Sequence, residues 1–280
     1  MIINLPEKEP FVIGIYSGSS EPSSVAEFLN SFVEEMKSLE NFCLCVDNKR
    51  YSLQLGAIIF DAPARAFMKC VKRYSGYNSC ERCTQEGLYL SGKVTFPDFN
   101  SPPRTDEDFN NMTSEDHHTG ITPLRQLTVG CVSQFPLDYK HLVCLGVVRR
   151  IILLWVKGPL SCRIPMATVK DISSDLIFMR KHFPKDFCRK PRSLLEVMHW
   201  KATEFRHFML YTGPVALFGK VKSHVCRNFL MLSVLLSPSF SEQYCDYAEK
   251  LLSVFVKNFA TIYGSCFFGL QCTWAASLGR

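Results

Sequence analysis

The stretch that decides the predicted fold is residues 51–71, which reads YSLQLGAIIFDAPARAFMKCV. An apolar side chain stands at every second position from 53 to 59, which is typical of a strand with one buried face. Pro63 suits the first turn of a following helix over residues 64–71. Asp61 lies between the two elements, so the sequence predicts a strand that leads directly into a helix.

Upstream of this stretch the sequence predicts a strand and a helix. Residues 11–16, FVIGIY, are β-branched and aromatic and have the length of a buried strand. Ser24 and Glu27 form a capping-box pattern, and apolar residues follow at helical spacing as far as Met36. We therefore expect a strand over residues 11–16 and an amphipathic helix of about four turns.

A hairpin is predicted between residues 42–46 and 51–60, because Asp47, Asn48, Lys49 and Arg50 provide turn chemistry between two apolar runs. From about residue 74 to 130 the periodicity fails, and glycine, proline and asparagine are frequent. Long irregular segments of this kind are usually functional, stapled by a metal or flexible.

The second half of the chain is predicted to be helical. Prolines punctuate it near the expected helix ends. The predicted helices cover residues 141–156, 166–180, 193–210, 221–236 and 241–263. Strands and helices followed by helices alone indicate an α/β or α+β fold, with a sheet layer that carries a helical domain.

The composition indicates a globular protein. The 280 residues are 47% hydrophobic and 21% charged, and the net charge of +6 permits contact with nucleic acid. Neither a signal peptide nor an apolar run long enough to span a bilayer is seen. The 13 cysteines lack the spacing of a secreted disulfide scaffold. We expect a nuclear or cytoplasmic protein with reduced thiols that is neither secreted nor bound to a membrane.

Several enzyme classes lack sequence support. The phosphate-binding loop, the dinucleotide-binding glycine motif, the zincin helix motif and the serine-hydrolase elbow are all absent from the sequence. Asp61 offers a different chemistry, because a carboxylate at the carboxyl end of a strand can bind Mg²⁺. The alternative is that Asp61 caps the helix that follows it.

A CxxC motif, Cys80-Glu-Arg-Cys83, offers two thiolates that can bind one tetrahedral Zn²⁺. Completion needs two more ligands, for which His117, His118 and His141 are the nearest histidines downstream. The alternative is that the two cysteines are ordinary loop residues. A thioredoxin-like redox role is disfavoured because the motif follows a helix in an irregular segment.

Two groups of charged residues can be explained by surface structure, without a functional site. Residues 200–207 place charged side chains on one helical face, for which a surface ion-pair face is the default. A basic cluster can follow DNA phosphates or lie in a solvated loop. Its members are Lys181, Lys185, Arg189, Lys190 and Arg192.

Several motifs, in order, resemble the transposases of CACTA-type (En/Spm-like) cut-and-paste DNA elements. The resemblance covers residues 5–265. Its motifs are FDAPARA at 60–66, GYNSCERC at 76–83, FP at 96–97, RTD at 104–106, HHTG at 117–120, FPLD at 135–138, HLVCLGV at 141–147 and WKATEFR at 200–206.

The resemblance implies an RNase H-like sheet core with a large all-α insertion. In that family three acids bind two divalent metal ions, for which the resemblance implies Mg²⁺. The ions activate water and then a 3′-hydroxyl for attack on DNA. Asp61 matches the second acid, and Cys80 and Cys83 match zinc ligands. The implied division is a partial core (1–73), a CxxC segment (74–135), a helical insertion (136–263) and a divergent tail (264–280).

The family's first catalytic acid has no counterpart before Phe11. Its last catalytic acid and its histidine pair have no counterpart after Tyr263. The chain is therefore expected to be a relative truncated at both ends, a transposase remnant without DNA cleavage or strand transfer and with weak DNA contacts. Two alternatives stay open. One is an active Mg²⁺-dependent transposase with substitute acids such as Glu204 or Asp138. The other is a non-enzymatic host protein that binds a protein partner through its helices. Glu204 itself is expected to form an ion pair within the insertion.

Overall fold

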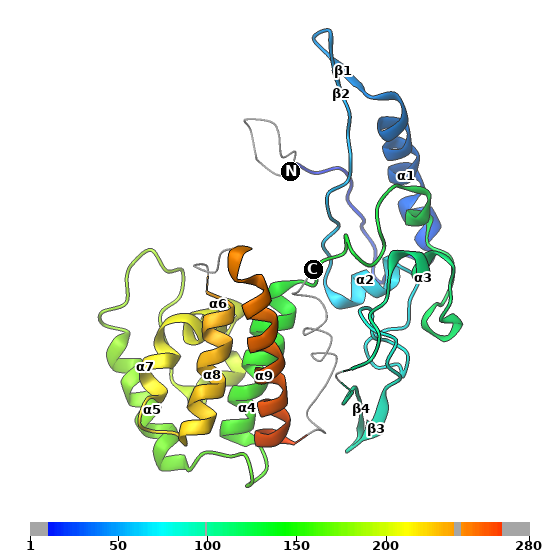
Figure 1. Cartoon of the computed structure of the whole chain (residues 1–280). Helices are drawn as coiled ribbons and strands as arrows, with labels where there is room; N and C mark the ends of the chain where they lie inside the picture. Colours follow the sequence, from blue (N-terminus) through cyan, green and yellow to red (C-terminus); the bar gives the residue numbers. More distant parts are fainter. Residues whose placement is uncertain (1–10, 99, 238–241, 265–280) are drawn as a thin grey trace.

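The computed structural model describes residues 11–98, 100–237 and 242–264 and contains two bodies (Figure 1). The first contains α1 (Val25–Phe42), β1 (Leu44–Val46), β2 (Lys49–Tyr51), α2 (Ala62–Met68), β3 (Leu88–Leu90), β4 (Lys93–Thr95), α3 (Asp106–Asn110), η1 (Glu115–His117) and η2 (Pro123–Gln126). The second contains η3 (Lys140–Val148), α4 (Arg149–Lys157), α5 (Met166–Met179), η4 (Leu194–His199), α6 (Ala202–His207), η5 (Phe208–Thr212), α7 (Gly213–Leu217), α8 (Ser223–Leu235), η6 (Glu242–Tyr244) and α9 (Cys245–Tyr263).

The predicted mixture of helices and strands is confirmed. Among the described residues the strands form two antiparallel two-stranded sheets, β1 with β2 and β3 with β4. The larger RNase H-like sheet that the resemblance implies is not seen in this part of the chain.

Helix α1 forms where the capping pattern predicts it and is longer than expected. The Ser24 hydroxyl accepts a hydrogen bond from the backbone N–H of Glu27 at 3.2 Å, so one free donor of the first turn is satisfied. Leu29, Val33 and Met36 are spaced three or four residues apart and form the buried face.

The predicted hairpin is confirmed only near its turn. Asp47 and Asn48 have φ angles of 51° and 59°, which is the backbone conformation of a tight two-residue hairpin turn. Strand β2 ends at Tyr51, so the strand predicted over residues 51–60 is wrong beyond its first residue. Phe60 makes one isolated parallel bridge with Leu137, and Ile58 donates its N–H to the carbonyl of Gln134 at 2.9 Å.

The strand predicted over residues 11–16 is wrong. This segment has no regular structure, and its apolar side chains are exposed, with Ile15 86% exposed. A strand is stabilised by hydrogen bonds to a neighbouring strand, and the described residues provide no such neighbour here. High β-propensity alone therefore leaves these residues extended and open to solvent.

The helical second half follows the predicted pattern, with some differences in helix type. The helix predicted at 141–156 begins as the π-helix η3, which covers its first eight residues, and η5 is also a π-helix. The helix predicted at 193–210 is divided into the 3₁₀-helix η4, α6 and η5. In Figure 1, α4, α8 and α9 lie side by side in the helical body. Trp155 Nε1–H donates to the hydroxyl of Tyr263 at 2.8 Å and so joins α4 to α9.

Two apolar cores stabilise these bodies. The core of the first body includes side chains from α1, α2, α3 and η2. The helical core includes Trp155, Phe205 and Phe229, all 1% exposed or less. Cys80, Cys83 and Phe96 also belong to the helical core. The irregular segment is therefore joined to the helices by packing, while the predicted division into four segments stays a prediction.

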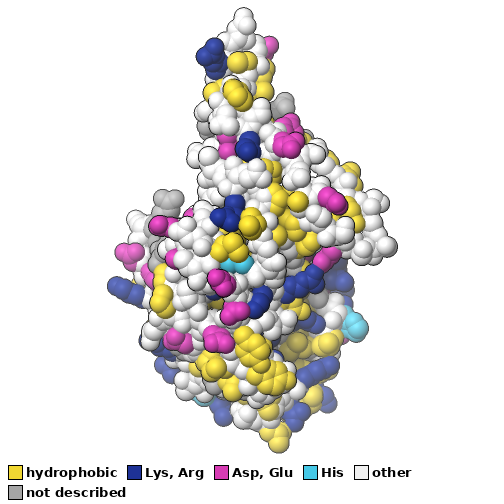
Figure 2. Space-filling view, turned by 90° about the vertical axis from the view of Figure 1, so that its right-hand side faces the viewer, with side chains coloured by type: hydrophobic (Ala, Val, Ile, Leu, Met, Phe, Trp, Pro, Cys, Tyr) yellow, Lys and Arg dark blue, Asp and Glu magenta, His cyan; other side chains and the backbone are white. Residues whose placement is uncertain are grey.

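At the surface, β1 and β2 form a projecting tip that carries hydrophobic and charged side chains together (Figure 2). Leu44, Val46 and Tyr51 are exposed there. Among the described helices, none combines the length and the apolar character that crossing a bilayer requires.

Candidate functional site

Asp61 caps helix α2. Its Oδ1 accepts the backbone N–H of Ala64 at 2.9 Å, and Pro63 lies in the first turn as expected. The side chain is half-buried at the point where the extended segment meets the helix. The structure therefore shows the capping role of Asp61. The backbone of the first turn of α2 holds its carboxylate in place.

Next to this helix, Glu81 forms a shielded ion-pair cluster with Arg65 and Lys69. Arg65 Nε lies 2.9 Å from one carboxylate oxygen of Glu81, and Lys69 Nζ lies 2.8 Å from the other. Burial opposes the ionisation of Glu81, but Lys69 and Arg65 together outweigh it and lower its pKa to about 2. Burial lowers the pKa of Lys69 as well, despite the attraction of Glu81. The pair therefore stabilises the fold less than the pKa of Glu81 alone would suggest.

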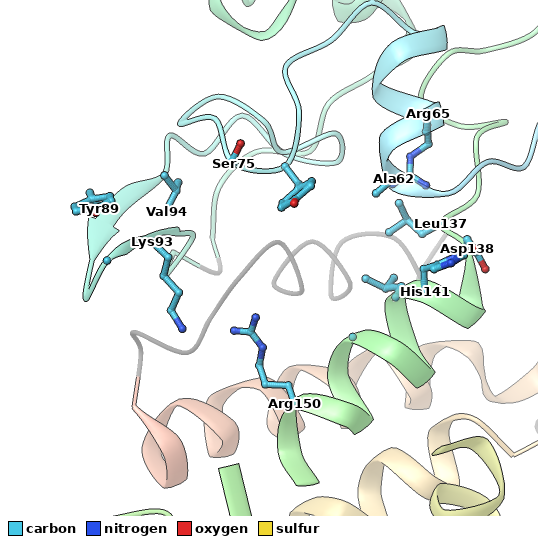
Figure 3. Close-up of a pocket in the computed structure, with 14 residues that line it drawn as sticks. Ala62, Arg65, Ser75, Tyr89, Lys93, Val94, Leu137, Asp138, His141 and Arg150 are labelled. Carbon is cyan, nitrogen blue, oxygen red and sulfur yellow. Dashed lines mark hydrogen bonds and ion pairs between the residues drawn. The ribbon is translucent and has the colours of Figure 1, made fainter. Parts of the chain in front are cut away.

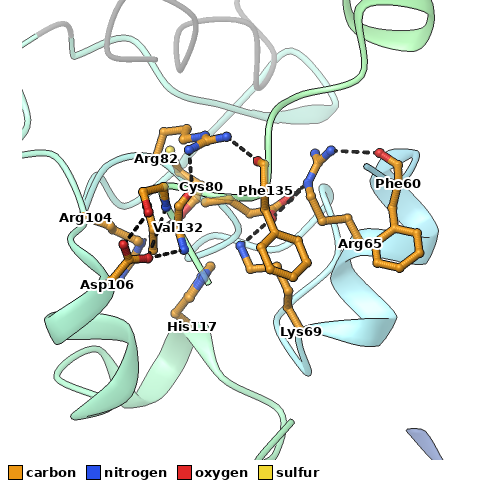
Figure 4. A network of polar contacts seen from close by, with 12 residues as sticks. Phe60, Arg65, Lys69, Cys80, Arg82, Arg104, Asp106, His117, Val132 and Phe135 are labelled. Atoms are coloured by element: carbon orange, nitrogen blue, oxygen red, sulfur yellow. Dashed lines mark hydrogen bonds and ion pairs between the residues drawn. The ribbon is translucent and has the colours of Figure 1, made fainter. Parts of the chain in front are cut away.

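Two arginines hold the CxxC segment in place (Figure 4). Arg82 donates to the backbone carbonyls of Val132 and Phe135. Arg104 Nε donates to the carbonyl of Cys80 at 2.9 Å. The turn between the cysteines is thus fixed from two sides by charge-assisted hydrogen bonds.

Asp106 completes this network. Its Oδ1 accepts the backbone N–H groups of Val132 and Ser133 at 2.6 and 3.1 Å, and its Oδ2 accepts the Ser133 hydroxyl at 2.5 Å. A Cβ atom at Gly130 would lie 2.3 Å from the Asp106 carboxylate, so glycine is needed for this close approach. The RTD motif at residues 104–106 therefore has a structural role.

Cys80 and Cys83 are buried thiols in mutual contact. Their Sγ atoms are 3.0 Å apart, and the Cys83 N–H also donates to Cys80 Sγ at 3.2 Å. Hydrogen bonding from Cys80 lowers the pKa of Cys83 to about 7, against the effect of burial and with help from the Gln85 N–H and Arg104. Burial raises the pKa of Cys80. The arrangement supports one thiolate at Cys83 that is stabilised by a protonated Cys80.

The three histidines weighed as zinc ligands lie in different environments. His117 Nδ1 is 2.7 Å from the carbonyl of Asn78, and its buried Nε2 has no hydrogen-bond partner among the described residues. Burial, and then Arg104, lower the pKa of His117 to about 3, so its ring is neutral. The His118 ring packs against Phe109. His141 pairs with Asp138 beside a pocket.

Of the four ligands that a structural zinc site needs, the described residues bring only Cys80 and Cys83 together. Zinc-bound thiolates lie roughly 3.8 Å apart, because each Zn–S bond is about 2.3 Å in tetrahedral geometry. The separation of 3.0 Å fits a thiol–thiolate hydrogen bond better. Within residues 11–98, 100–237 and 242–264, no three His, Cys, Asp or Glu side chains gather closely enough to hold a metal. The described residues do not form a complete zinc site, so zinc binding by Cys80 and Cys83 stays a prediction.

A two-metal magnesium site does not fit the described acids either. Glu204 is buried, pairs with Arg192 Nε at 2.7 Å and accepts the Lys201 N–H at 2.7 Å, as an ion-pair role predicts. Asp138 pairs with His141. Neither of these acids belongs with Asp61 to a group that could hold a metal among the described residues.

Sequence reasoning missed a pocket of about 500 Å³ between the two bodies (Figure 3). Helix α2, the β3–β4 hairpin, η3 and α4 contribute its walls. Its lining residues are Ala62, Arg65, Tyr74, Ser75, Tyr89, Gly92, Lys93, Val94, Leu137, Asp138, His141, Leu142, Gly146 and Arg150. Some lining residues belong to the FDAPARA, FPLD and HLVCLGV motifs, but no single motif predicts the pocket, because it is assembled from segments up to about 90 residues apart.

Comparisons with family models, with curated proteins and with solved structures found no match for this chain. Function is therefore inferred from the residues and their geometry.

Proposed function

We propose that the chain is a transposase-derived protein, a remnant of a CACTA-type cut-and-paste transposase with RNase H-like ancestry, that does not cleave DNA. The observation that carries the proposal is that distant motifs of the resemblance meet in one buried polar network (Figure 4). Arg65 of the first motif binds Glu81 of the CxxC motif, and Arg104 of the RTD motif binds the Cys80 carbonyl. Arg82 reaches the carbonyl of Phe135, which begins the FPLD motif.

The meeting of these motifs in one network supports common ancestry. Each motif supplies residues that the others need, so the motifs are expected to be retained together. Long-range polar networks that are fully shielded depend on every member, and removal of one leaves a buried charge without a partner. The same geometry explains the motifs without catalysis, since Asp61 caps α2 and Glu81 neutralises two cations. The proposed protein thus keeps the scaffold of its ancestors.

Weak, sequence-independent DNA contact is part of the proposal. Lys181, Lys185, Arg189 and Lys190 are exposed in the loop between α5 and η4, where they are accessible to phosphates. Arg192, the last member of this basic cluster, binds Glu204 instead. A nuclear or cytoplasmic location, zinc at Cys80 and Cys83, and a protein partner bound through residues 136–263 stay predictions.

A plasmid nicking assay in Mg²⁺ and in Mn²⁺ tests the absence of cleavage. Asp61→Asn is the decisive variant, because asparagine caps helices as well as aspartate does but cannot act as a metal-binding carboxylate. Asp61→Ala loses both properties and is expected to destabilise the protein by about 1 kcal/mol. We expect no nicking above background from the wild type or from either variant.

Nicking by the wild type that disappears in Asp61→Asn, with unchanged thermal stability, would show an active enzyme and overturn the proposal. Nicking that persists equally in Asp61→Asn would point to a contaminating nuclease or to substitute acids. Glu204→Gln and Asp138→Asn would then separate these two explanations.

A further inference from the structure

A series of aromatic rings follows the loop that connects α5 to η4. At the end of α5, the ring centroid of Phe178 lies 5.4 Å from that of His182. In the loop, the rings of Phe183 and Phe187 are 4.5 Å apart, and Phe187 lies 5.5 Å from Tyr211 of η5. The series therefore runs from the C-terminal end of α5 across the loop to η5.

The middle of this series holds the loop against the helices. His207 of α6 lies 5.6 Å from the ring of Phe183 and 4.7 Å from that of Phe187, and it hydrogen-bonds with the backbone of Arg189. His207 is buried, and the two phenylalanines are half-buried. These contacts fix the path of the loop, so its side chains are presented from a supported backbone.

The two ends of the series are open to solvent. Phe178 is 64% exposed and Tyr211 is 44% exposed. In Figure 1, α5 and α7, which follows η5, lie at the edge of the helical body away from the first body. Packing within the chain accounts for the middle of the series, whereas it leaves these two rings accessible to a ligand.

Exposed cations alternate with the rings along the loop. Asp186 is the single acid in residues 181–190, which read KHFPKDFCRK. The four cations form no ion pair with the part of the chain that the structure describes. They are Lys181, Lys185, Arg189 and Lys190. Their charge is therefore available to an anionic partner.

Alternating rings and cations match the chemistry of an unpaired nucleic-acid strand. Such a strand presents one phosphate and one free base face per nucleotide, and proteins bind it with a basic surface and aromatic rings on which the bases stack. A duplex would use the cations alone, because its base faces are covered by neighbouring base pairs.

We propose that this surface binds single-stranded nucleic acid, with the phosphates along the four loop cations and bases stacked on Phe178 and Tyr211. The inference rests on the proposed DNA contact of the basic cluster and adds the kind of nucleic acid that it prefers. DNA and RNA strands share this chemistry, and the test distinguishes them.

The test measures fluorescence anisotropy of a labelled oligothymidylate of about 20 nucleotides, titrated with the full chain at low salt. A duplex of equal length is the comparison. We expect saturable binding of the single strand, with a Kd about tenfold lower than that of the duplex, as one stacked base would give. Polyglutamate, which has charge but no bases, should compete about tenfold less well than unlabelled strand at equal charge.

Salt dependence separates the contribution of the cations from that of the rings. For a single strand, the logarithm of the association constant falls against the logarithm of the salt concentration with a slope of about −0.7 per neutralised phosphate. Four cations therefore predict a slope of about −3. Lys181→Gln/Lys185→Gln should bring the slope to about −1.4. Phe178→Ala and Tyr211→Ala should each weaken binding about tenfold and leave the slope unchanged.

Matched controls remove the same groups elsewhere. Tyr247→Ala removes an exposed ring from α9, and Lys49→Gln/Arg50→Gln removes two exposed cations from β2. Neither should change the Kd by more than about twofold. Far-UV circular dichroism establishes that each variant is folded. If Tyr211→Ala is not folded, Phe178→Ala, whose ring is more exposed, decides the test.

The failures are distinguishable. Binding of neither strand nor duplex would overturn this inference together with the proposed DNA contact. Duplex binding as tight as strand binding, or equal competition by polyglutamate, would overturn this inference and leave the DNA contact standing. Equal weakening by the control variants would overturn the assignment to this surface. Tighter binding of oligouridylate than of oligothymidylate would identify RNA as the ligand and the reverse DNA, and either result supports the proposal.

Discussion

Lys69 Nζ lies 2.8 Å from Glu81 Oε2 and forms an ion pair with it, although the Lys69 side chain is only 2% exposed. Lysine is almost never buried to this degree unless a negative group compensates its charge. Glu81 itself stands between the two cysteines of the CxxC motif. The same carboxylate also binds Arg65, so one acid pairs with a cation within α2 and with another at its C-cap. The stability of the first body therefore depends on Glu81.

Glu81→Gln should destabilise the protein strongly, because it leaves Arg65 and Lys69 shielded from water with no carboxylate. Breaking a buried ion pair from one side costs about 3–5 kcal/mol. Urea unfolding followed by circular dichroism measures the change. Glu86→Gln, at an exposed position five residues later, is the control and should stay within about 0.5 kcal/mol of the wild type. A similar small effect for both variants would show that the cluster is open to water.

The same carboxylate makes stability depend on pH in acid. The pKa of Glu81 is about 2 in the folded protein, below its ordinary value of 4.5. A lowered pKa in the folded state stabilises the protein above the ordinary value, and this contribution is lost as the pH falls from 4.5 towards 2. The difference in unfolding free energy between wild type and Glu81→Gln should therefore shrink over that interval. A difference that is constant with pH would contradict this assignment.

Cys83 should react as a thiolate near neutral pH, and this property should depend on Cys80. Only the thiolate is alkylated by iodoacetamide, and the pKa of Cys83 is about 7 because Cys80 donates a hydrogen bond to it. Mass spectrometry of Cys83 alkylation against pH should show a midpoint near this value in the wild type and a higher midpoint in Cys80→Ala. Cys70→Ala, outside the motif, is the control and should leave the midpoint unchanged.

Metal removal adds a second measurement to this experiment. Where zinc occupies the two thiols, alkylation of Cys83 is slow until the protein is treated with EDTA. Alkylation that is equally fast before and after EDTA would count against bound zinc in the purified protein.

Tyr263→Phe should weaken the joint between α4 and α9. It removes the hydroxyl that accepts the Trp155 N–H at 2.8 Å and leaves a buried donor without a partner, which costs about 1–3 kcal/mol. Urea unfolding followed by tryptophan fluorescence and by circular dichroism measures the change. Tyr247→Phe, on the same helix but 58% exposed, should have little effect. Equal effects of both substitutions would contradict a specific role for this hydrogen bond.

The parts of the fold that sequence predicts well depend on interactions within four residues. The Ser24 cap of α1 and the turn at Asp47 and Asn48 are of this kind, and both form as expected. Asp61 is intermediate. Its position predicts both a cap and a metal ligand, and only the surrounding acids can decide between these roles.

The parts that sequence misses depend on distant residues. Residues 11–16 have the composition of a strand, but pairing requires a partner that composition does not specify. Apolar spacing places η3 within a helix correctly, yet it does not distinguish π from α geometry in so short a segment. Lys69 and Glu81 carry no local signal of burial, since their pairing appears only once α2 packs beside the CxxC turn.

We predict that the exposed segment of residues 11–16 shortens the lifetime of the protein in a cell. Chaperones and proteases continuously sort proteins that display apolar surface, so abundance depends on such segments even when the rest of the chain is folded. Ile13 and Ile15 are 66% and 86% exposed and their replacement removes no core packing. In a pulse-chase experiment, Ile13→Lys/Ile15→Lys should therefore lengthen the half-life, and an unchanged half-life would rule this effect out. The steady-state amount of this protein would then be set less by the stability of its two cores than by six residues that pack against neither.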